Sequence, residues 1–358
     1  MRKSVNCGGV IIGCGSPVSI QSMTNVDTRD TKKLIDQINE LRIAGCDIVR
    51  CAIPDMDAAL SFREAKLKTD IPLVADIHFN YKLALKAIDY GCDKIRINPG
   101  NIGSTDNLKE VVLKAKERNI PIRVGVNSGS LQKDILQKYG GVTAEALAES
   151  GIKTLNTVEE LGYDQLVVSI KSSNVKMNFD AHMILREKTD HPIHIGITES
   201  GTFKDGSLKS AIGIGALLLA GVGDTMRVSL TDNPVEEVKL AKKILETVGI
   251  RNKYIDIVSC PTCGRTEVDL IRMANDADEK LEVVRKMISE RNLKPLKIAI
   301  MGCVVNGPGE SREADYGIAG GKGEGLIFSH GEIIEKVAED RLIDRLIEII
   351  VKDEENSN

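Results

Sequence analysis

The sequence predicts a (β/α)8 barrel followed by a smaller α+β domain, and three observations support this fold class. Short segments rich in β-branched residues alternate with longer amphipathic stretches as far as about residue 250. The amphipathic stretches repeatedly end in Gly before the next apolar segment, as in AGCDIVR and YGCDKIR, and Gly ends helices because it tolerates the left-handed conformation. Beyond residue 250 the order of the segments changes. We therefore expect a barrel over residues 1–250 and a second domain over residues 251–358.

Eight segments are expected to form the barrel strands. Amphipathic patterns between them, such as residues 30–45 and 107–119, predict helices, and eight such repeats in this length are typical of a (β/α)8 barrel. An open doubly wound sheet is the main alternative, but it usually has a GxGxxG loop after its first strand, where this sequence has SMTNVDTRD. The expected strands are PVSIQSM (17–23), DIVRCAI (47–53), PLVADI (72–77), KIRINPG (94–100), PIRVGV (121–126), QLVVSIK (165–171), PIHIGIT (192–198) and DTMRVSL (224–230).

The C-terminal part of the chain has a different pattern. Three apolar segments, YIDIVSC, LKIAIMG and GEGLIFS, are expected to be strands, and residues 267–291 and 331–352 are expected to be helices. This mixture indicates an α+β domain of ordinary size. No low-complexity linker precedes it, so we expect the two domains to be joined directly.

Composition excludes several classes of function. Aromatic residues make up 3% of the chain, Trp is absent and the net charge is −4, so neither stacking platforms nor a basic surface for nucleic acid is expected. The longest apolar run, residues 211–223, is short and interrupted by Gly, which argues against a membrane span. The apolar stretch after MRKS is too short for a signal peptide. We therefore expect a cytoplasmic protein whose eight cysteines are reduced thiols or metal ligands.

Polar residues gather at the carboxyl ends of the expected barrel strands, where barrel enzymes place their chemistry. Five cations there outnumber two carboxylates, Asp76 and Glu199. Any one cation could belong to the surface or to a structural ion pair, but a set of uncompensated charges inside a barrel is very costly. The set therefore predicts a polyanionic ligand, a phosphate or diphosphate ester, and the Gly-rich stretch 198–215 also fits phosphate binding. The series is Gln21, Ser22, Arg50, Asp76, His78, Arg96, Asn98, Arg123, Asn127, Lys171, Glu199 and Arg227.

Two members of this series have more than one interpretation. Lys171 could bind phosphate or form a Schiff base, as lysines do in barrel aldolases. Glu199 could donate a proton, with a pKa tuned by burial against the neighbouring cations. It could equally be a salt-bridge partner that orients Arg227 or Lys171.

Three cysteines of the second domain have a spacing that suggests metal binding. Cys260 and Cys263 form a CxxC motif, and Cys303 follows in MGCVVNGPGE, so the pattern is C-x2-C-x39-C. Each segment follows an apolar strand, and its Gly and Pro residues form turns that leave backbone N–H groups free to face sulfur. Glu310, in the same loop as Cys303, is the nearest oxygen ligand. The other five cysteines lie singly in the barrel and are expected to pack as small apolar residues.

Three kinds of site remain open from this spacing. A redox dithiol needs only Cys260 and Cys263 and leaves Cys303 unexplained. Structural zinc usually takes four Cys or His ligands, and His330 and the barrel cysteines have no zinc-like spacing. An iron–sulfur cluster held by three cysteines, with its fourth iron open or bound by oxygen, fits the pattern better than zinc or a dithiol.

Together the motifs resemble the 4-hydroxy-3-methylbut-2-enyl diphosphate synthase family, in its bacterial two-domain form. The resemblance covers residues 2 to 350. It is carried by IQSMTNVDT, DIVRCAIP, LVADIHFNYKLA, IRINPGNIG, IRVGVNSGSL, VVSIKSSNV, HIGITESG, SCPTCGRT and MGCVVNGPGE.

The resemblance implies an iron–sulfur oxidoreductase of isoprenoid biosynthesis by the methylerythritol phosphate pathway. Such enzymes open the ring of 2-C-methyl-D-erythritol 2,4-cyclodiphosphate and remove a hydroxyl group, using two electrons supplied singly by flavodoxin or ferredoxin. The resemblance implies a [4Fe-4S] cluster with Cys260, Cys263, Cys303 and Glu310 as ligands. It also implies a homodimer in which the cluster domain of one subunit caps the barrel of the other.

Two other classes of protein use only part of these residues. A cluster-bearing electron carrier or regulator would use the cysteines and leave the cationic ring without a ligand. A metal-free barrel aldolase or pterin-type transferase would use the ring and leave the three cysteines without a role.

Overall fold

The computed structural model describes residues 2–264, 266, 268–303 and 313–356. The chain divides into two compact units, Met1–Arg251 and Asn252–Asn358. Each unit has its own hydrophobic core, so each is described by itself.

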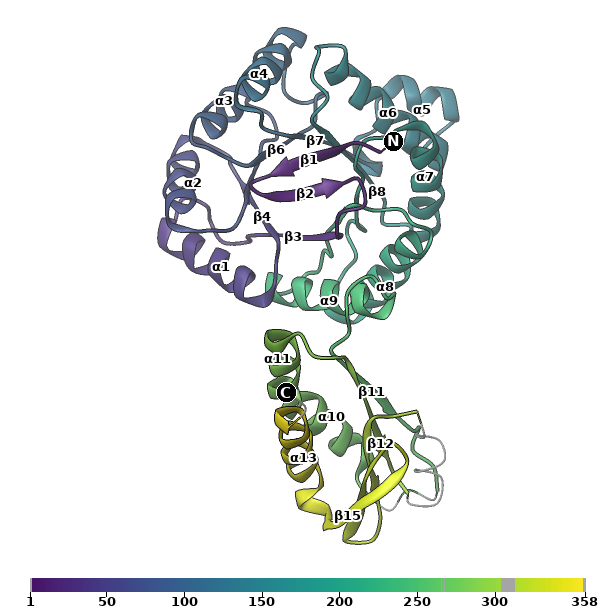
Figure 1. Cartoon of the computed structure of the whole chain (residues 1–358). Coiled ribbons are helices and arrows are strands. Elements are labelled where there is room, and N and C mark those ends of the chain that lie inside the picture. The colour runs from purple at the N-terminus through teal and green to yellow at the C-terminus, as the bar shows by residue number, and fades with distance from the viewer. Residues whose placement is uncertain (1, 265, 267, 304–312, 357–358) are drawn as a thin grey trace. The chain divides into compact units, whose positions relative to one another are not determined.

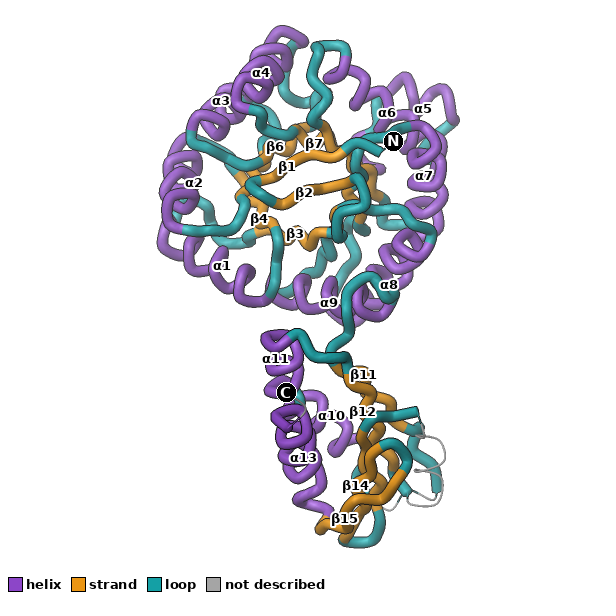
Figure 2. Tube along the Cα trace, viewed as in Figure 1, coloured by secondary structure: helices purple, strands orange, loops and turns teal. Residues whose placement is uncertain are grey.

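The first unit is a barrel of eight parallel strands surrounded by helices (Figures 1 and 2). The strand order is β8-β7-β6-β5-β4-β3-β10-β9, and a parallel bridge between Val168 and Ile193 joins the two ends of this order. The predicted barrel is confirmed, and each expected segment holds one strand. The strands are β3 (Ser19–Met23), β4 (Ile48–Ala52), β5 (Leu73–Asp76), β6 (Lys94–Ile97), β7 (Ile122–Asn127), β8 (Leu166–Lys171), β9 (His194–Ile195) and β10 (Thr225–Met226).

Helices follow the strands and cover the outside of the barrel (Figure 2). Polar N-cap side chains start most of them; Asp55, for example, accepts a hydrogen bond from the Ala58 N–H at the start of α2. Gly45 ends α1 with a φ of 96°, the left-handed conformation expected from the AGCD motif. The helices are α1 (Thr31–Ala44), α2 (Met56–Lys68), α3 (Tyr81–Asp89), α4 (Thr105–Arg118), α5 (Lys133–Tyr139), α6 (Ala144–Glu159), α7 (Val175–Lys188), α8 (Phe203–Leu219) and α9 (Pro234–Thr247), with a 3-10 turn η1 (Ser128–Ser130).

Side chains along each barrel strand point alternately toward the surrounding helices, where the hydrophobic core lies, and toward the barrel interior, where the predicted site lies. Ile20, Val49, Ile95 and Val124 belong to the hydrophobic core of the first unit. Because successive side chains of a strand point to opposite faces, their neighbours in sequence face the barrel interior. Those interior positions carry the predicted cations. The register of β6 and β7 places Arg96 beside Arg123, and that of β7 and β8 places Lys171 beside Asn127.

An N-terminal hairpin, which the sequence pattern did not predict, covers the end of the barrel where the strands begin (Figure 1). Its strands are β1 (Ser4–Cys7) and β2 (Val10–Gly13). Val5, Cys7 and Ile12 form a small buried cluster with the interior barrel residues Ile48, Val74 and Val167. The hairpin therefore closes the end of the barrel opposite to the predicted site.

The second unit is a five-stranded mixed sheet with order β11-β12-β13-β14-β15. Its strands are β11 (Ile255–Ser259), β12 (Leu296–Met301), β13 (Tyr316–Gly320), β14 (Glu324–Ser329) and β15 (Glu332–Ala338). The first three run parallel, and β14 and β15 are antiparallel to their neighbours. The helices are α10 (Leu270–Lys280), α11 (Glu282–Arg291) and α13 (Leu342–Asn356), with a 3-10 turn η2 (Glu339–Arg341).

The helix expected over residues 331–352 is wrong in its first part. Residues Glu332–Ala338 form β15, which pairs with β14 through a two-residue turn at His330 and Gly331. Both turn residues have positive φ, 49° and 83°, which is the conformation that a tight hairpin needs. The helix begins only at Leu342. Within the described parts of the chain, no helix combines the length and apolar character needed to cross a membrane.

Candidate active site

Most of the predicted barrel residues meet around one cavity at the carboxyl ends of the strands. The cavity has a volume of about 220 Å³. Seven of the residues predicted from the sequence to bind substrate line it, and Asn98 does not. The lining residues are Met23, Arg50, Asp76, His78, Arg96, Arg123, Gly125, Asn127, Ser169, Lys171, Thr198, Arg227 and Ser229.

Asp76 fixes two of the cations at the end of β5. Its Oδ1 accepts a hydrogen bond of 3.1 Å from Nη1 of Arg96, and its Oδ2 lies 3.5 Å from Nε of Arg50. Burial alone would raise the pKa of Asp76, but Arg50, Arg96 and Arg123 outweigh it and hold that pKa below its ordinary value. Asp76 is therefore a buried, ionised carboxylate that orients two guanidinium groups.

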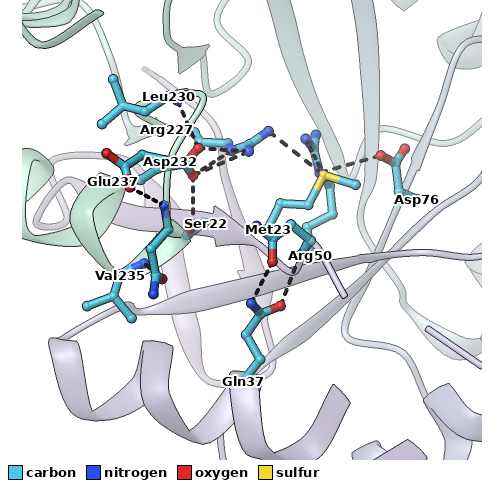
Figure 3. A network of polar contacts seen from close by, with 12 residues as sticks. Ser22, Met23, Gln37, Arg50, Asp76, Arg227, Leu230, Asp232, Val235 and Glu237 are labelled. Atoms are coloured by element: carbon cyan, nitrogen blue, oxygen red, sulfur yellow. Dashed lines mark hydrogen bonds and ion pairs between the residues drawn. The ribbon is translucent and has the colours of Figure 1, made fainter. Parts of the chain in front are cut away.

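Arg227 is paired with a carboxylate that the sequence analysis missed, Glu237. Glu237 lies in the first turn of α9, is 3% exposed, and its Oε1 lies 3.2 Å from Nη2 of Arg227. It also accepts hydrogen bonds from the Ser22 hydroxyl at 2.9 Å and the Leu230 N–H at 3.0 Å (Figure 3). Arg227 thus has Glu237 as its carboxylate partner, and among the described residues no ion pair joins Arg227 to Glu199.

The sequence does contain a signal for Glu237. The buried positions of α9 are Pro234, Glu237, Val238, Ala241, Ile244 and Leu245, which recur at the spacing of one helix face. A carboxylate on such a face must have a partner. Glu237 does not belong to the residues at the strand ends, because it comes from a helix.

Met23, the last residue of β3, is a second missed contributor. Its Sδ lies 3.0 Å from Nη2 and 3.2 Å from Nε of Arg50, and 3.8 Å from Nη1 of Arg227. Figure 3 shows the thioether between these two arginines. A polarizable sulfur therefore separates two like charges at the rim of the cavity.

Arg123 and Lys171 are the cations without a carboxylate of their own. Among the described residues, neither side chain forms an ion pair, and Nε and Nη1 of Arg123 are buried without a hydrogen-bond partner. Burial, with Arg123, Arg227 and other cations nearby, lowers the pKa of Lys171 well below its ordinary value. Arg123 keeps its proton because a guanidinium stays charged in proteins. Arg123 therefore faces the cavity with an uncompensated positive charge, and Lys171 does so when it is protonated.

Gly196 leaves the space that Lys171 occupies. A β-carbon at this position would lie 2.8 Å from Nζ of Lys171 and 2.6 Å from the carbonyl oxygen of Arg227. Gly125 has a similar role on β7, where a β-carbon would lie 3.2 Å from Nε of Arg96. Glycines at these two positions therefore allow long cationic side chains to lie flat against the strand ends.

Two predicted residues lie outside the wall of the cavity. Asn98 is half-buried in the turn after β6, where its Oδ1 accepts a hydrogen bond from the Gly100 N–H at 3.1 Å. Glu199 is exposed and directly follows Thr198, which does line the cavity. Its φ is 53°, a left-handed backbone conformation that disfavours residues other than Gly and that often marks functional positions.

The three predicted cysteine ligands follow adjoining strands of the second unit. The parallel register of β11 and β12 pairs Ser259 with Ile300, so Cys260 and Cys303 emerge at the same edge of the sheet. The Gly302 N–H donates a hydrogen bond of 3.4 Å to Sγ of Cys260. Cys263 is tied to this edge through Thr266, whose Oγ1 accepts a hydrogen bond of 3.1 Å from the Cys263 N–H.

Thr266 also packs against the strand that leads to Cys303. A β-carbon on Gly302 would lie 2.9 Å from Cγ2 of Thr266, so the CxxC loop and the residue before Cys303 are in contact. Thiols and backbone donors of this kind suit a thiolate-bound iron–sulfur group in donor chemistry and placement. Among the residues that the structure describes, however, no three His, Cys, Asp or Glu side chains are already grouped to hold a metal ion.

The fourth predicted ligand, Glu310, lies outside the described residues. Of the five cysteines predicted to pack in the barrel, four are buried and one is not. Cys7, Cys46, Cys51 and Cys92 are buried as expected, and burial raises the pKa of the Cys46 and Cys51 thiols to about 12. Cys14 is exposed, in the turn after β2, so its interpretation as a packing residue is wrong.

Solved structures with a similar fold are barrels of other functions. The chain has a TM-score of 0.50 to type I 3-dehydroquinate dehydratase from Clostridium difficile, at 16% identity over 68% of this chain and 98% of that one. Dihydropteroate synthase from Yersinia pestis has a TM-score of 0.50 at 12% identity, over 69% and 98% of the two chains. At this identity the likeness shows the barrel fold alone.

Sequence comparison is far more specific. Residues 2–242 match the GcpE TIM-barrel domain and residues 256–352 match the GcpE protein C-terminal domain. A 4-hydroxy-3-methylbut-2-en-1-yl diphosphate synthase (flavodoxin) of Clostridium acetobutylicum is 55% identical over 96% of this chain and 97% of its own. One of Clostridium perfringens is 55% identical over 97% of each chain. The chain therefore belongs to the GcpE family, whose two domains it matches in order and over nearly its whole length.

Proposed function

We propose that this chain is a 4-hydroxy-3-methylbut-2-enyl diphosphate synthase that reductively opens 2-C-methyl-D-erythritol 2,4-cyclodiphosphate. The observation that carries the proposal is the surplus of positive charge around one cavity of the barrel. Five cations line it, and Asp76 and Glu237 are the carboxylates paired with them. The names of the similar proteins from two Clostridium species support this substrate class.

The charges of the cavity suit a diphosphate. Asp76 and Glu237 neutralise part of the charge of Arg50, Arg96 and Arg227, which leaves a surplus of three positive charges when Lys171 is protonated. A cyclic diphosphate brings negative charge and many acceptor oxygens, so it would satisfy donors that are otherwise buried without partners. The substrate would thus complete the electrostatics of the barrel.

We assign the cations to two groups according to their partners. Arg123 and Lys171, which have no carboxylate, would make the main contacts to the phosphoryl oxygens. Arg50, Arg96 and Arg227 are held in place by carboxylates and would present fixed donors at the rim of the cavity. Asn127 would add a neutral hydrogen-bond donor from the cavity wall. Asn98 would contribute from the neighbouring turn.

The reaction needs electrons as well as binding. Substrate, two electrons and two protons give 4-hydroxy-3-methylbut-2-enyl diphosphate and one water, as a C–O bond of the ring and a hydroxyl group are lost. An iron–sulfur cofactor is expected for this chemistry. When bound by Cys260, Cys263, Cys303 and Glu310, a [4Fe-4S] cluster would supply the electrons one at a time. Flavodoxin or ferredoxin would be the electron donor, and the names of the two Clostridium proteins specify flavodoxin.

Glu199 is the proposed source of a proton. Its backbone has a strained, left-handed φ just after the strand segment 192–198, and this strain supports a functional role. It directly follows the cavity residue Thr198, so its backbone lies beside the cavity. General acids commonly lie within hydrogen-bond reach of the leaving oxygen only in the bound complex.

Two further features belong to the proposal. The enzyme would be a homodimer, in which the cluster unit of one chain serves the barrel of the other. It would act in the cytoplasm, where thiols such as those of the three cluster cysteines remain reduced.

The test is anaerobic turnover of the cyclodiphosphate, with reduced dithionite and a viologen as the electron source. The expected product is the linear allylic diphosphate, formed only by protein that contains iron. Turnover by iron-free protein would favour a metal-free barrel lyase or transferase. An iron-loaded protein that neither binds nor converts the cyclodiphosphate would favour an electron carrier.

A further inference from the structure

A second cavity adjoins the cationic one on the barrel. Its volume is about 290 Å³, and both cavities have Asp76 and His78 in their walls. Apart from these two residues and Asn80, the side chains that line it are apolar. They are Ala52, Ile53, Pro54, Phe79 and Leu83. A charged cavity and an apolar cavity therefore share one wall.

The position of the apolar cavity follows from the parallel strands β4 and β5. Their register pairs Ala52 with Asp76, so the apolar residues after β4 lie beside the carboxylate that holds two arginines. Leu83 closes the cavity from the first turn of α3 and is 3% exposed.

The rim of the apolar cavity is formed by an exposed aromatic residue. Phe79 is 72% exposed, although an aromatic ring usually gains from burial. Its ring centroid lies 5.9 Å from that of His78, the residue shared with the cationic cavity. Phe79 is thus placed to cover the hydrocarbon chain of a ligand that extends from the cationic cavity past His78.

We propose that the two cavities together bind diphosphate esters that carry a branched hydrocarbon chain. The diphosphate would lie among the cations, and the chain would pass His78 into the apolar cavity. The inference rests on the proposed function, whose product is a short member of this chemical class. At about 30 Å³ for each non-hydrogen atom, comparable to the share of a water molecule in the liquid, the apolar cavity holds roughly ten carbon atoms.

Such binding would regulate the enzyme by competition. The cyclic substrate carries hydroxyl and phosphoryl groups on a compact skeleton, so it gains little from an apolar cavity. A longer allylic diphosphate keeps the same anionic group and adds buried apolar surface. Reductive removal of the product's hydroxyl group as water, followed by condensation of the resulting five-carbon diphosphates with release of diphosphate, would make such esters, and these esters would then exclude the substrate.

The test compares ligands of equal charge on the full-length, iron-loaded protein. Methyl diphosphate, dimethylallyl diphosphate and geranyl diphosphate would be titrated calorimetrically under anaerobic conditions, and each would be tested as a competitor of the cyclodiphosphate. Burial of several methylene-sized groups predicts at least about tenfold tighter binding of the ten-carbon ester than of the methyl ester. Dimethylallyl diphosphate should be intermediate.

Two variants test where the chain binds. Ala52→Leu reduces the volume of the apolar cavity and should remove most of the advantage of geranyl diphosphate, while the affinity for methyl diphosphate stays the same. Phe79→Ala removes an exposed ring, which does not endanger folding, and should reduce the same advantage by several-fold. Leu113→Ala removes an exposed apolar side chain of α4 and should change neither affinity.

The outcomes separate this inference from the proposed function. Equal affinities for methyl and geranyl diphosphate would overturn the inference and leave the proposed function standing. A geranyl advantage that survives both variants would overturn it as well. If Phe79→Ala instead alters the oligomeric state and no chain-length effect exists, the cavity is a protein contact. If folded protein binds none of the diphosphates and not the cyclodiphosphate, the proposed function itself is wrong.

Discussion

Glu237 binds Arg227 from the first turn of α9, with Oε1 3.2 Å from Nη2 of the arginine. The same carboxylate accepts hydrogen bonds from Ser22 on β3 and from the backbone of Leu230. One buried side chain thus ties a helix to two strand ends and fixes a cation at the rim of the site (Figure 3). The last helix of the barrel is therefore part of the electrostatic framework of the cavity.

We expect Glu237→Gln to destabilise the barrel. The amide has no charge, so the charged hydrogen bonds to Arg227 are lost, at a cost of about 1.5–3 kcal/mol. The midpoint of thermal unfolding, followed by circular dichroism, should fall by several degrees. Glu236→Gln is the matched control, because Glu236 is partly exposed and pairs with Lys239 on the same helix. Equal midpoints for the two variants would show that the buried pair does not stabilise the barrel.

Lys171 should take up protons when a diphosphate binds. Burial and the nearby arginines lower its pKa. At pH values between that lowered pKa and the ordinary pKa near 10.4, the Lys171 side chain is therefore neutral in a fraction of the protein molecules. A bound anion favours the charged form and raises the pKa. Affinity should therefore fall as the pH rises through this window.

Calorimetry measures the proton uptake directly. Titrations at about pH 9 in two buffers of different ionisation enthalpy should give different apparent enthalpies, with net uptake on binding. Lys171→Met should abolish that difference. The same uptake in parent and variant would assign the proton to another group.

The three cysteines at the carboxyl edge of β11 and β12 should control iron content. Anaerobically prepared protein should be brown and hold about four irons per chain. Serine at Cys260, Cys263 or Cys303 should abolish both the colour and the bound iron. Cys46→Ser should leave iron content unchanged, because Cys46 is buried in the barrel with its Sγ 3.1 Å from the carbonyl oxygen of Ile48. One zinc per chain and no iron uptake on reconstitution would contradict the account of this centre.

Glu199→Gln should separate proton transfer from binding. Glutamine keeps the size and hydrogen bonding of the side chain but cannot supply a proton. Turnover should therefore slow by roughly 10²- to 10⁴-fold, with iron content and substrate affinity close to those of the parent. A variant that loses iron, or that turns over normally, would mean that Glu199 has a different role.

The sequence predicted the barrel well because its signals are local. Each strand is a short apolar segment, and Gly marks the ends of helices such as α1 at Gly45. The hairpin β1–β2 was not predicted, because its strands have four residues each, which is too few for a periodic pattern of apolar residues to appear. Their place is set by packing against Ile48 and Val74.

The sequence of β15 predicts a helix for a similar reason. Its apolar residues Ile333, Ile334 and Val337 recur at the spacing of a helix face. Pairing with β14 and the left-handed turn at His330 and Gly331 override that pattern. Long-range pairing of this kind cannot be read from local periodicity.

The candidate site was predictable in part. The rule that barrel chemistry lies at the carboxyl ends of strands placed Arg50, Arg96, Arg123 and Lys171 at one cavity. The same rule missed Glu237, which comes from a helix face. Met23 was also missed, because a methionine at a strand end carries no charge to mark it.

The central claim is that the cations around the barrel cavity bind a cyclic diphosphate. The most direct measurement is the calorimetric affinity of the cyclodiphosphate for the parent and for Arg96→Ala, Arg123→Ala and Lys171→Ala, with Lys109→Ala on the exposed face of α4 as control. Each site variant should retain its iron and bind roughly 10- to 150-fold more weakly, since about 1.5–3 kcal/mol is lost with a charged hydrogen bond. If all three bind the cyclodiphosphate as the parent does, the cations are structural and the substrate site lies elsewhere.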